Sequence, residues 1–192
     1  PYRTLAQLLA AIEKSPGKLS YADGGAKSPS HFVFAKLALR RPGLNAQEIP
    51  YNSAGDAAVA TVSGQVDFIS SVLTSVEALA RAGQLRILAI ADNVRYPSFP
   101  NVPTVAEAAN LPGYRFVDWS GIFGPANLPS DIVGMVHDAL GEVTSAPDFV
   151  KFMTEIGSRS VSGKSPSNLA ALVKAALAET QELYSKLDLG KS

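Results

Sequence analysis

Three polar loops carry the residue types that could bind a small anion. Each follows a short apolar run and precedes a helical pattern, and together they span residues 24–30, 52–56 and 70–74. Each combines small hydroxyl side chains with free backbone N–H groups at a helix N-terminus, where the helix dipole favours negative charge. The hydroxyls of Ser30, Ser53 and Thr74 could equally serve only to cap their own helices. The pattern therefore supports either a shared anion site or a set of separate caps.

One carboxylate stands inside an apolar run. Asp67 follows Val66 and precedes Phe68 and Ile69 in a predicted strand. A carboxylate in such a place needs a hydrogen-bonding partner. It could bond to the backbone of a neighbouring loop and order that loop, or it could orient a ligand-binding loop indirectly. Both interpretations stay open.

Enzymatic and metal chemistry find little support in the residue pattern. The chain contains the residue types of a catalytic triad, with Ser28 as nucleophile, His31 as base and Asp67 as orienting acid. The chain lacks a G-x-S-x-G elbow, however, and His31 is predicted to lie in the first turn of a helix. His31 and His137 are far apart in the sequence, have no evident carboxylate cluster, and the chain has no cysteine. We therefore expect a protein that is not an enzyme and has no metal or cofactor.

The first 118 residues predict an α/β fold. A first helix, opened by a capping box of Thr4 and Gln7, carries a stripe of Leu5, Leu8, Leu9 and Ile12. Strands are predicted at residues 18–22, 48–51, 66–70 and 85–91. Helices are predicted at residues 31–40 and 57–63, from a capping box at 74–77 to Gly83, and from another at 104–107. This alternation favours a largely parallel sheet flanked by helices, with ligands at the carboxyl ends of its strands.

The pattern changes to helical in the last third. Helices are predicted to begin at Ser130, which could cap the first of them, at Pro147, and after Ser165 with an end near Leu187. An extended segment, residues 115–123, precedes them. We predict two domains, residues 1–118 and 119–192.

Charge and hydropathy exclude several classes. Lys plus Arg equals Asp plus Glu at 17 each, so the basic excess of a dedicated nucleic-acid binder is absent. Apolar residues make up 46% of the chain, which disfavours disorder. No apolar run is long enough to span a bilayer. The start of the chain lacks the features of a signal peptide, so export would imply that one has been removed.

Several segments, in order along the chain, match the sequence motifs of one known protein family. The loop through Gly25, Ser28 and His31 resembles its Gly-x-Gly-Ser-x-x-His pattern. Its most recognisable stretch is matched by residues 100–107, Pro-Asn-Val-Pro-Thr-Val-Ala-Glu. The other matching segments are residues 1–5, 16–22, 50–55, 64–67, 82–86 and 119–129. Together these segments resemble the substrate-binding proteins of tripartite tricarboxylate transporters (the Bug, or TctC-like, family).

The resemblance implies a type II periplasmic-binding-protein fold of two α/β lobes with ligand held between them. It implies a periplasmic location, delivery of the ligand to membrane permease subunits, and a small organic acid as ligand, such as a di- or tricarboxylate, an amino acid or an aromatic acid. Residues 1–118 would form the whole second lobe and residues 119–192, with their helical C-terminal portion, only the end of the first. Without the N-terminal part of the first lobe, the ligand would be held from one side.

Carried over residue by residue, the resemblance points to one binding loop and to a second group of candidates. The loop comprises Gly25, Ala26, Lys27, Ser28 and Ser30. The second group comprises Ser53, Ala54 and Asp67. Lys27 replaces a family glycine, and Tyr51-Asn52-Ser53-Ala54 replaces the usual Tyr-Lys-Gly-Ser, so the chain departs from the family in both loops. A ligand-sensing domain like the effector half of a LysR regulator is the alternative function.

Overall fold

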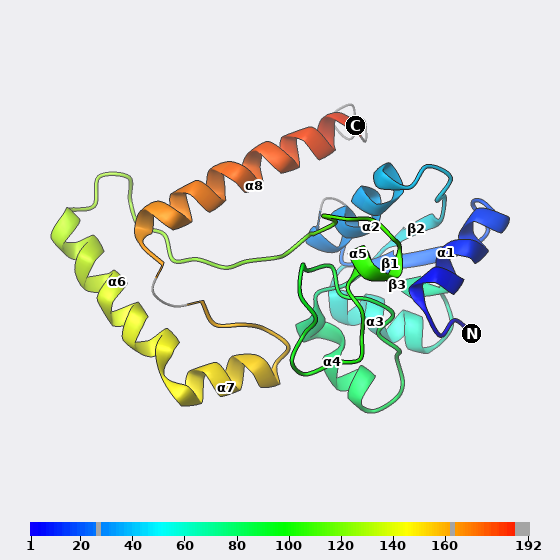
Figure 1. Cartoon of the computed structure of the whole chain (residues 1–192), viewed down its shortest axis with the longest axis horizontal. Coiled ribbons are helices and arrows are strands. Elements are labelled where there is room, and N and C mark those ends of the chain that lie inside the picture. The colour runs from blue at the N-terminus through cyan, green and yellow to red at the C-terminus, as the bar shows by residue number, and fades with distance from the viewer. Residues whose placement is uncertain (26–27, 162–163, 187–192) are drawn as a thin grey trace. The chain divides into compact units, whose positions relative to one another are not determined.

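The computed structural model describes residues 1–25, 28–161 and 164–186 (Figure 1). Ala26 and Lys27, two of the predicted ligand-binding residues, lie outside the described residues. The chain forms two compact units, Pro1–Asp118 and Trp119–Ser192, which are described separately.

The first unit is built on a parallel sheet. Its strands are β1 (Ser20–Asp23), β2 (Gln47–Pro50) and β3 (Phe68–Ile69), in the order β2-β1-β3. Each strand leads into a helix: α2 (Pro29–Arg40), α3 (Ala54–Val62) and α4 (Leu73–Arg81), respectively. The strand-to-helix rhythm of the sequence and the parallel sheet flanked by helices are therefore confirmed (Figure 1).

The first helix, α1 (Leu5–Lys14), buries the four apolar residues that its spacing predicts. Thr4 caps it, because the Thr4 hydroxyl accepts a hydrogen bond from the Gln7 backbone nitrogen at 3.2 Å. In a full capping box the Gln7 side chain would accept a hydrogen bond from the Thr4 backbone nitrogen. Here Gln7 Oε1 accepts from the Arg3 backbone nitrogen instead. The buried stripe joins a core that includes Tyr21 and Phe34, whose ring centroids lie 4.5 Å apart.

The strand predicted at residues 85–91 is wrong. In the described part of the chain this segment makes only an isolated parallel bridge, between Ile90 and Thr104. The Ile90 nitrogen donates to the Pro103 carbonyl at 2.9 Å, and the Val105 nitrogen donates to the Ile90 carbonyl at 2.8 Å. The pairing stops there because α5 (Val105–Ala108) begins at once, opened by the predicted capping box of Thr104 and Glu107. The apolar character of the segment reflects packing against the core of the first unit.

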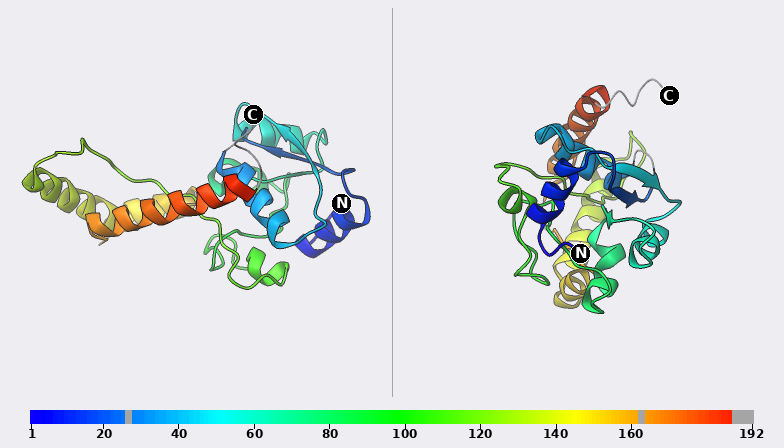
Figure 2. Two further views of the ribbon diagram at one scale, coloured as in Figure 1. Left: turned by 90° about the horizontal axis from the view of Figure 1, so that it is seen from above. Right: turned by 90° about the vertical axis from the view of Figure 1, so that its right-hand side faces the viewer.

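The second unit contains α6 (Ser130–Ser145), α7 (Pro147–Glu155) and α8 (Pro166–Lys186), the last a single continuous helix (Figure 2). Pro147 occupies the first turn of α7 as predicted. Ser130 was expected to cap α6 but is its first residue, after Pro129, and makes no cap bond. No residue of α6 or α7 is fully buried, and these helices expose Met135, Val136, Val143, Val150 and Phe152. Among the described residues, no helix is both long and apolar enough to cross a membrane.

Candidate functional site

The carboxyl ends of all three strands lie at one edge of the sheet, because the strands run in parallel. β1 ends at Asp23, β2 at Pro50 and β3 at Ile69, each before a loop into a helix. The first two loops are close together: a β-carbon added at Gly24 would lie 3.4 Å from the Ala54 nitrogen. The structure thus brings the start of α3 against the loop that follows β1.

The backbone N–H groups of the loop after β1 are largely used within the loop. The Gly24 nitrogen donates to Ser30 Oγ at 3.0 Å, and the Gly25 nitrogen donates to Asp23 Oδ1 at 2.7 Å. Gly25 has a φ of +108°, and a β-carbon there would lie 3.3 Å from the Tyr51 carbonyl oxygen. The positive φ favours glycine here, and a β-carbon would also make a tight contact with that oxygen. The expectation that these N–H groups stand free is therefore wrong for Gly24 and Gly25, and the bonds hold the loop in one shape.

Ser28, rather than Ser30, is the N-cap of α2. The helix begins at Pro29, and the Ser28 hydroxyl accepts from the His31 nitrogen at 3.3 Å. The sequence interpretation placed the cap two residues later because it overlooked that proline suits the first helical position. Ser30 is buried, and its hydroxyl lies 2.8 Å from Ser28 Oγ. Ser30 thus positions the loop, while Ser28 is half-buried and nearer to solvent.

The loop after β2 also begins with a capping serine. Ser53 Oγ accepts from the Asp56 nitrogen at 3.1 Å and donates to Asp56 Oδ2 at 2.8 Å. Ala54 follows as the first residue of α3, beside the loop that follows β1. Asp56 already places one negative charge in the first turn of α3, which offsets part of the helix dipole there.

The loop after β3 contributes structure more than ligand groups. Ser70 Oγ donates to the Ser30 carbonyl at 2.6 Å, which ties this loop to the first turn of α2. Thr74 does not cap α4: the helix begins one residue earlier, at Leu73, and its N-cap, Val72, makes no side-chain bond. The predicted capping box at residues 74–77 is therefore wrong, and Glu77 instead pairs with Arg81 at 2.6 Å.

Asp67 lies away from the other candidates. It directly precedes β3, at the amino end of the strands, and its Oδ2 accepts from the Ser20 nitrogen at 2.8 Å and hydroxyl at 3.1 Å. The carboxylate is exposed and holds the start of β1. Of the two interpretations left open by the sequence, the structural bond to a neighbouring backbone is the one observed.

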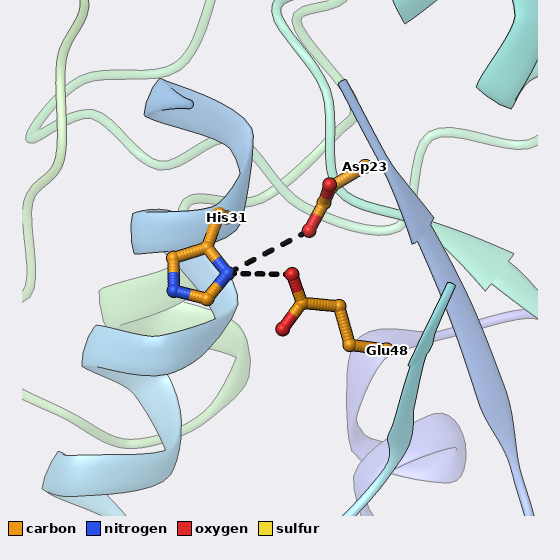
Figure 3. Close-up of side chains that lie close together, drawn as sticks. All are labelled: Asp23, His31 and Glu48. Carbon is orange, nitrogen blue, oxygen red and sulfur yellow. Dashed lines mark hydrogen bonds and ion pairs between the residues drawn. The ribbon is translucent and has the colours of Figure 1, made fainter. Parts of the chain in front are cut away.

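Near the carboxyl ends of β1 and β2 lies a cluster of titratable side chains that the sequence interpretation missed. His31 Nδ1 lies 2.8 Å from Glu48 Oε1 and 3.7 Å from Asp23 Oδ2 (Figure 3). The side chains of Asp23, His31 and Glu48 are 0%, 8% and 30% exposed. The statement that His31 has no carboxylate cluster nearby is therefore wrong.

The alternation of side chains along a strand was the sequence signal that could have indicated this cluster. Tyr21 and Asp23 are two residues apart in β1, and Glu48 pairs with Tyr21 in the neighbouring strand. All three side chains therefore fall on one face of the sheet, the face over which α2 packs.

Burial, and to a smaller extent the neighbouring Glu48 carboxyl, raise the pKa of the Asp23 carboxyl to about 6, against the lowering effect of the bond from the Gly25 nitrogen. Burial also raises the pKa of the Tyr21 hydroxyl, with Glu48 and Asp23 adding to it. Two carboxyl groups therefore flank one imidazole. The arrangement can bind a proton or a cation beneath a loop whose outer face carries hydroxyls.

The serine, histidine and aspartate considered as a catalytic set are not brought together. Ser28 Oγ is bonded to the His31 backbone nitrogen, while the His31 imidazole faces Asp23 and Glu48. Asp67 is at the other edge of the sheet.

Comparison with known proteins matches almost the whole chain to one family. The profile of the tripartite tricarboxylate transporter family receptor, TctC, covers residues 1–189. A UPF0065 protein in the tcbD-tcbE intergenic region of Pseudomonas sp. (strain P51) is 34% identical over 182 residues, covering 95% of this chain and 54% of that protein. The chain thus spans about half the length of this relative.

Two solved structures have the same fold. One, described as a periplasmic transporter, has a TM-score of 0.87 and 29% identity, covering 97% of this chain and 61% of that one. The other, R. palustris Rpa4515 with adipate, has a TM-score of 0.83 and 23% identity, covering 96% of this chain and 61% of that one. Both agree with the periplasmic-binding-protein type of fold that the sequence resemblance implies.

Proposed function

Because the chain belongs to the tripartite tricarboxylate transporter receptor (TctC) family, we propose that it captures a small organic carboxylate in the periplasm for a transporter of this type. Its structural relatives are periplasmic solute-binding proteins, which supports a binder rather than an enzyme. Membrane permease subunits would then be its partners.

The observation that carries the proposal is the meeting of two helix N-termini at one sheet edge. α2 and α3 both start there, and the Gly24 backbone lies against Ala54. A carboxylate at this point would face two positive dipole ends and the hydroxyls of Ser28 and Ser53. Gly25 would permit close approach of the ligand, and Ser30 would support Ser28 from behind.

We assign Pro1–Asp118 to the second lobe of the binding protein and Trp119–Ser192 to the C-terminal part of the first. The second unit leaves large apolar side chains exposed, including Met135 at 61%, Phe152 at 52% and Leu177 at 58%. A groove of about 660 Å³ along α8, between Phe123 and Leu177, is also lined mainly by apolar groups. Further first-lobe elements, for which the longer relatives have room, would cover such faces.

The ligand class follows from the family and the site together. Adipate is bound to Rpa4515, a protein of the same fold. Di- and tricarboxylates, amino acids and aromatic acids are the classes that this edge could take, through one carboxylate at the helix N-termini. We use adipate, citrate, glutamate and benzoate as representatives.

A pair of substitutions at Ser28 tests the proposal. Ser28→Ala removes the hydroxyl and should weaken binding of the preferred acid, measured by NMR titration of the full chain. Ser28→Asp keeps a capping oxygen for the His31 nitrogen but adds a negative charge, so it should weaken binding more while preserving the helix.

Thr4→Ala is the matched control, since it removes a cap that lies in α1 rather than at this edge. It should leave acid affinity unchanged. Equal affinity for the preferred acid in the Ser28 variants and the unsubstituted chain would refute the assignment of the site to this loop.

A further inference from the structure

The Asp23–His31–Glu48 cluster has the composition of a metal site. Each residue offers one donor atom, and the three donors lie within 4.8 Å of one another (Figure 3). The donors come from β1, α2 and β2, so the sheet and the helix packed on it hold them in place.

One buried oxygen of the cluster has no hydrogen bond. Asp23 is completely buried, yet its Oδ2 accepts no hydrogen bond from the residues that the structure describes. This oxygen points to His31 Nδ1, 3.7 Å away, while Oδ1 is held by the Gly25 nitrogen at 2.7 Å. Buried charged oxygens are normally satisfied by donors or by metal ions. The orientation of Asp23 is thus fixed from one side, and its free oxygen faces the other two donors.

The donor set selects the kind of cation. One imidazole nitrogen with two carboxylate oxygens is a combination that suits zinc and related transition metals, whereas calcium and magnesium prefer oxygen alone. Two positive charges would also offset the two carboxylates. We propose that Asp23, His31 and Glu48 bind a divalent transition-metal ion, with Zn²⁺ the best match, and that three protein donors leave a coordination position open.

The chain offers an unusually direct test, because it has only two histidines. The full chain, freed of metal with a chelator and dialysed, is titrated with zinc chloride while the imidazole ¹⁵N signals are followed by NMR. We expect the Nδ1 signal of His31 to shift and to saturate at one ion per chain. His137, which is partly exposed beside Asp138, serves as the internal comparison for weak surface binding.

Two variants separate the cluster from other sites. Glu48→Gln keeps the size of the side chain and should lower zinc affinity, measured by calorimetry, by more than about tenfold, since even outer-shell partners of metal ligands contribute about 10- to 100-fold. His137→Gln should leave the affinity unchanged. The NMR titration uses only the unsubstituted chain, so it tests the proposal even if Glu48→Gln fails to fold.

The proposal is refuted if zinc leaves the His31 signals in place, shifts only those of His137, or binds the folded Glu48→Gln variant as tightly as the unsubstituted chain. None of these measurements uses an organic acid. Their failure would leave the proposed transport function standing.

Discussion

Replacing Asp23 with Asn should stabilise the first unit at neutral pH when no metal is present. The side chain is completely buried, and its carboxyl has a pKa of about 6 against 3.8 for an ordinary aspartate. Because the folded chain holds this proton more tightly than the unfolded chain does, the stability contributed is fully present below pH 4. It is lost as the pH rises through about 6. Asn cannot ionise, and its side-chain oxygen can still accept from the Gly25 nitrogen, as Asp23 Oδ1 does.

The size of the effect follows from the gap between the two pKa values. This pKa gap corresponds to a loss of about 3 kcal/mol in the free energy of unfolding of the unsubstituted chain between acid and neutral pH. We therefore expect the free energy of unfolding of Asp23→Asn, relative to the unsubstituted chain, to rise by up to about 3 kcal/mol from pH 4 to pH 7.5. His31 and Glu48 face the same carboxyl, so their charges will set how much of that difference is realised.

Urea unfolding in the presence of EDTA measures the difference. Near-UV circular dichroism, measured in a Trp119→Phe background, reports on the first unit, since all tyrosines but Tyr184 lie within it and Trp119 belongs to the second unit. Glu107→Gln is a control of opposite sign: the Thr104 backbone and Arg95 lower the pKa of Glu107, so its contribution is present at neutral pH and lost on acidification. An Asp23→Asn variant that gains no stability between pH 4 and pH 7.5 would refute the account of Asp23 as a buried carboxylate that is costly to ionise.

Three further predictions test the core and the placement of the site. Ile12→Ala should destabilise the first unit by about 2–5 kcal/mol in urea, because Ile12 is fully buried, whereas Val59→Ala at a 66% exposed position should change it by less than about 0.5 kcal/mol. Asp67→Asn should leave the affinity for organic acids unchanged in NMR titrations, because Asp67 bonds to Ser20 at the opposite edge of the sheet; a clear loss of affinity would return it to the binding site. Lys27→Gly should change the order of preference among adipate, citrate, glutamate and benzoate, because it removes a positive charge from the candidate loop; an identical order in calorimetry would count against a role for Lys27.

The fold was predictable where local signals agreed with one another. The stripe of α1, the alternation of strand and helix, and the capping box of Thr104 and Glu107 all appear in the structure because each depends on spacing within one short segment. The segment 85–91 was misread because its apolar run has too short a partner for a strand to form, which is a property of the tertiary fold. Thr74 and Ser130 were misread as caps because α4 begins two residues, and α6 one residue, before a cap at that position would place the helix start.

The candidate site was predictable at the level of loops but less so at the level of atoms. The sequence indicated that the loops after β1 and β2 would meet, since parallel strands place their carboxyl ends together. It could not show that the Gly24 and Gly25 nitrogens bond within their own loop, because those bonds depend on side-chain direction. The cluster around His31 joins residues that are 8 and 17 positions from it in the sequence. Only the register between β1 and β2 brings the two carboxylates together.

Native mass spectrometry with the acid panel tests the central claim most directly. The 192-residue chain is compared with a version preceded by a first-lobe segment of the length found in its longer relatives. We expect the longer version to retain a small organic acid through desolvation, and the shorter chain to retain it weakly or not at all, because it offers one wall of the site. Retention of no acid by either version, across the whole panel, would contradict the assignment of this protein as a carboxylate-binding receptor.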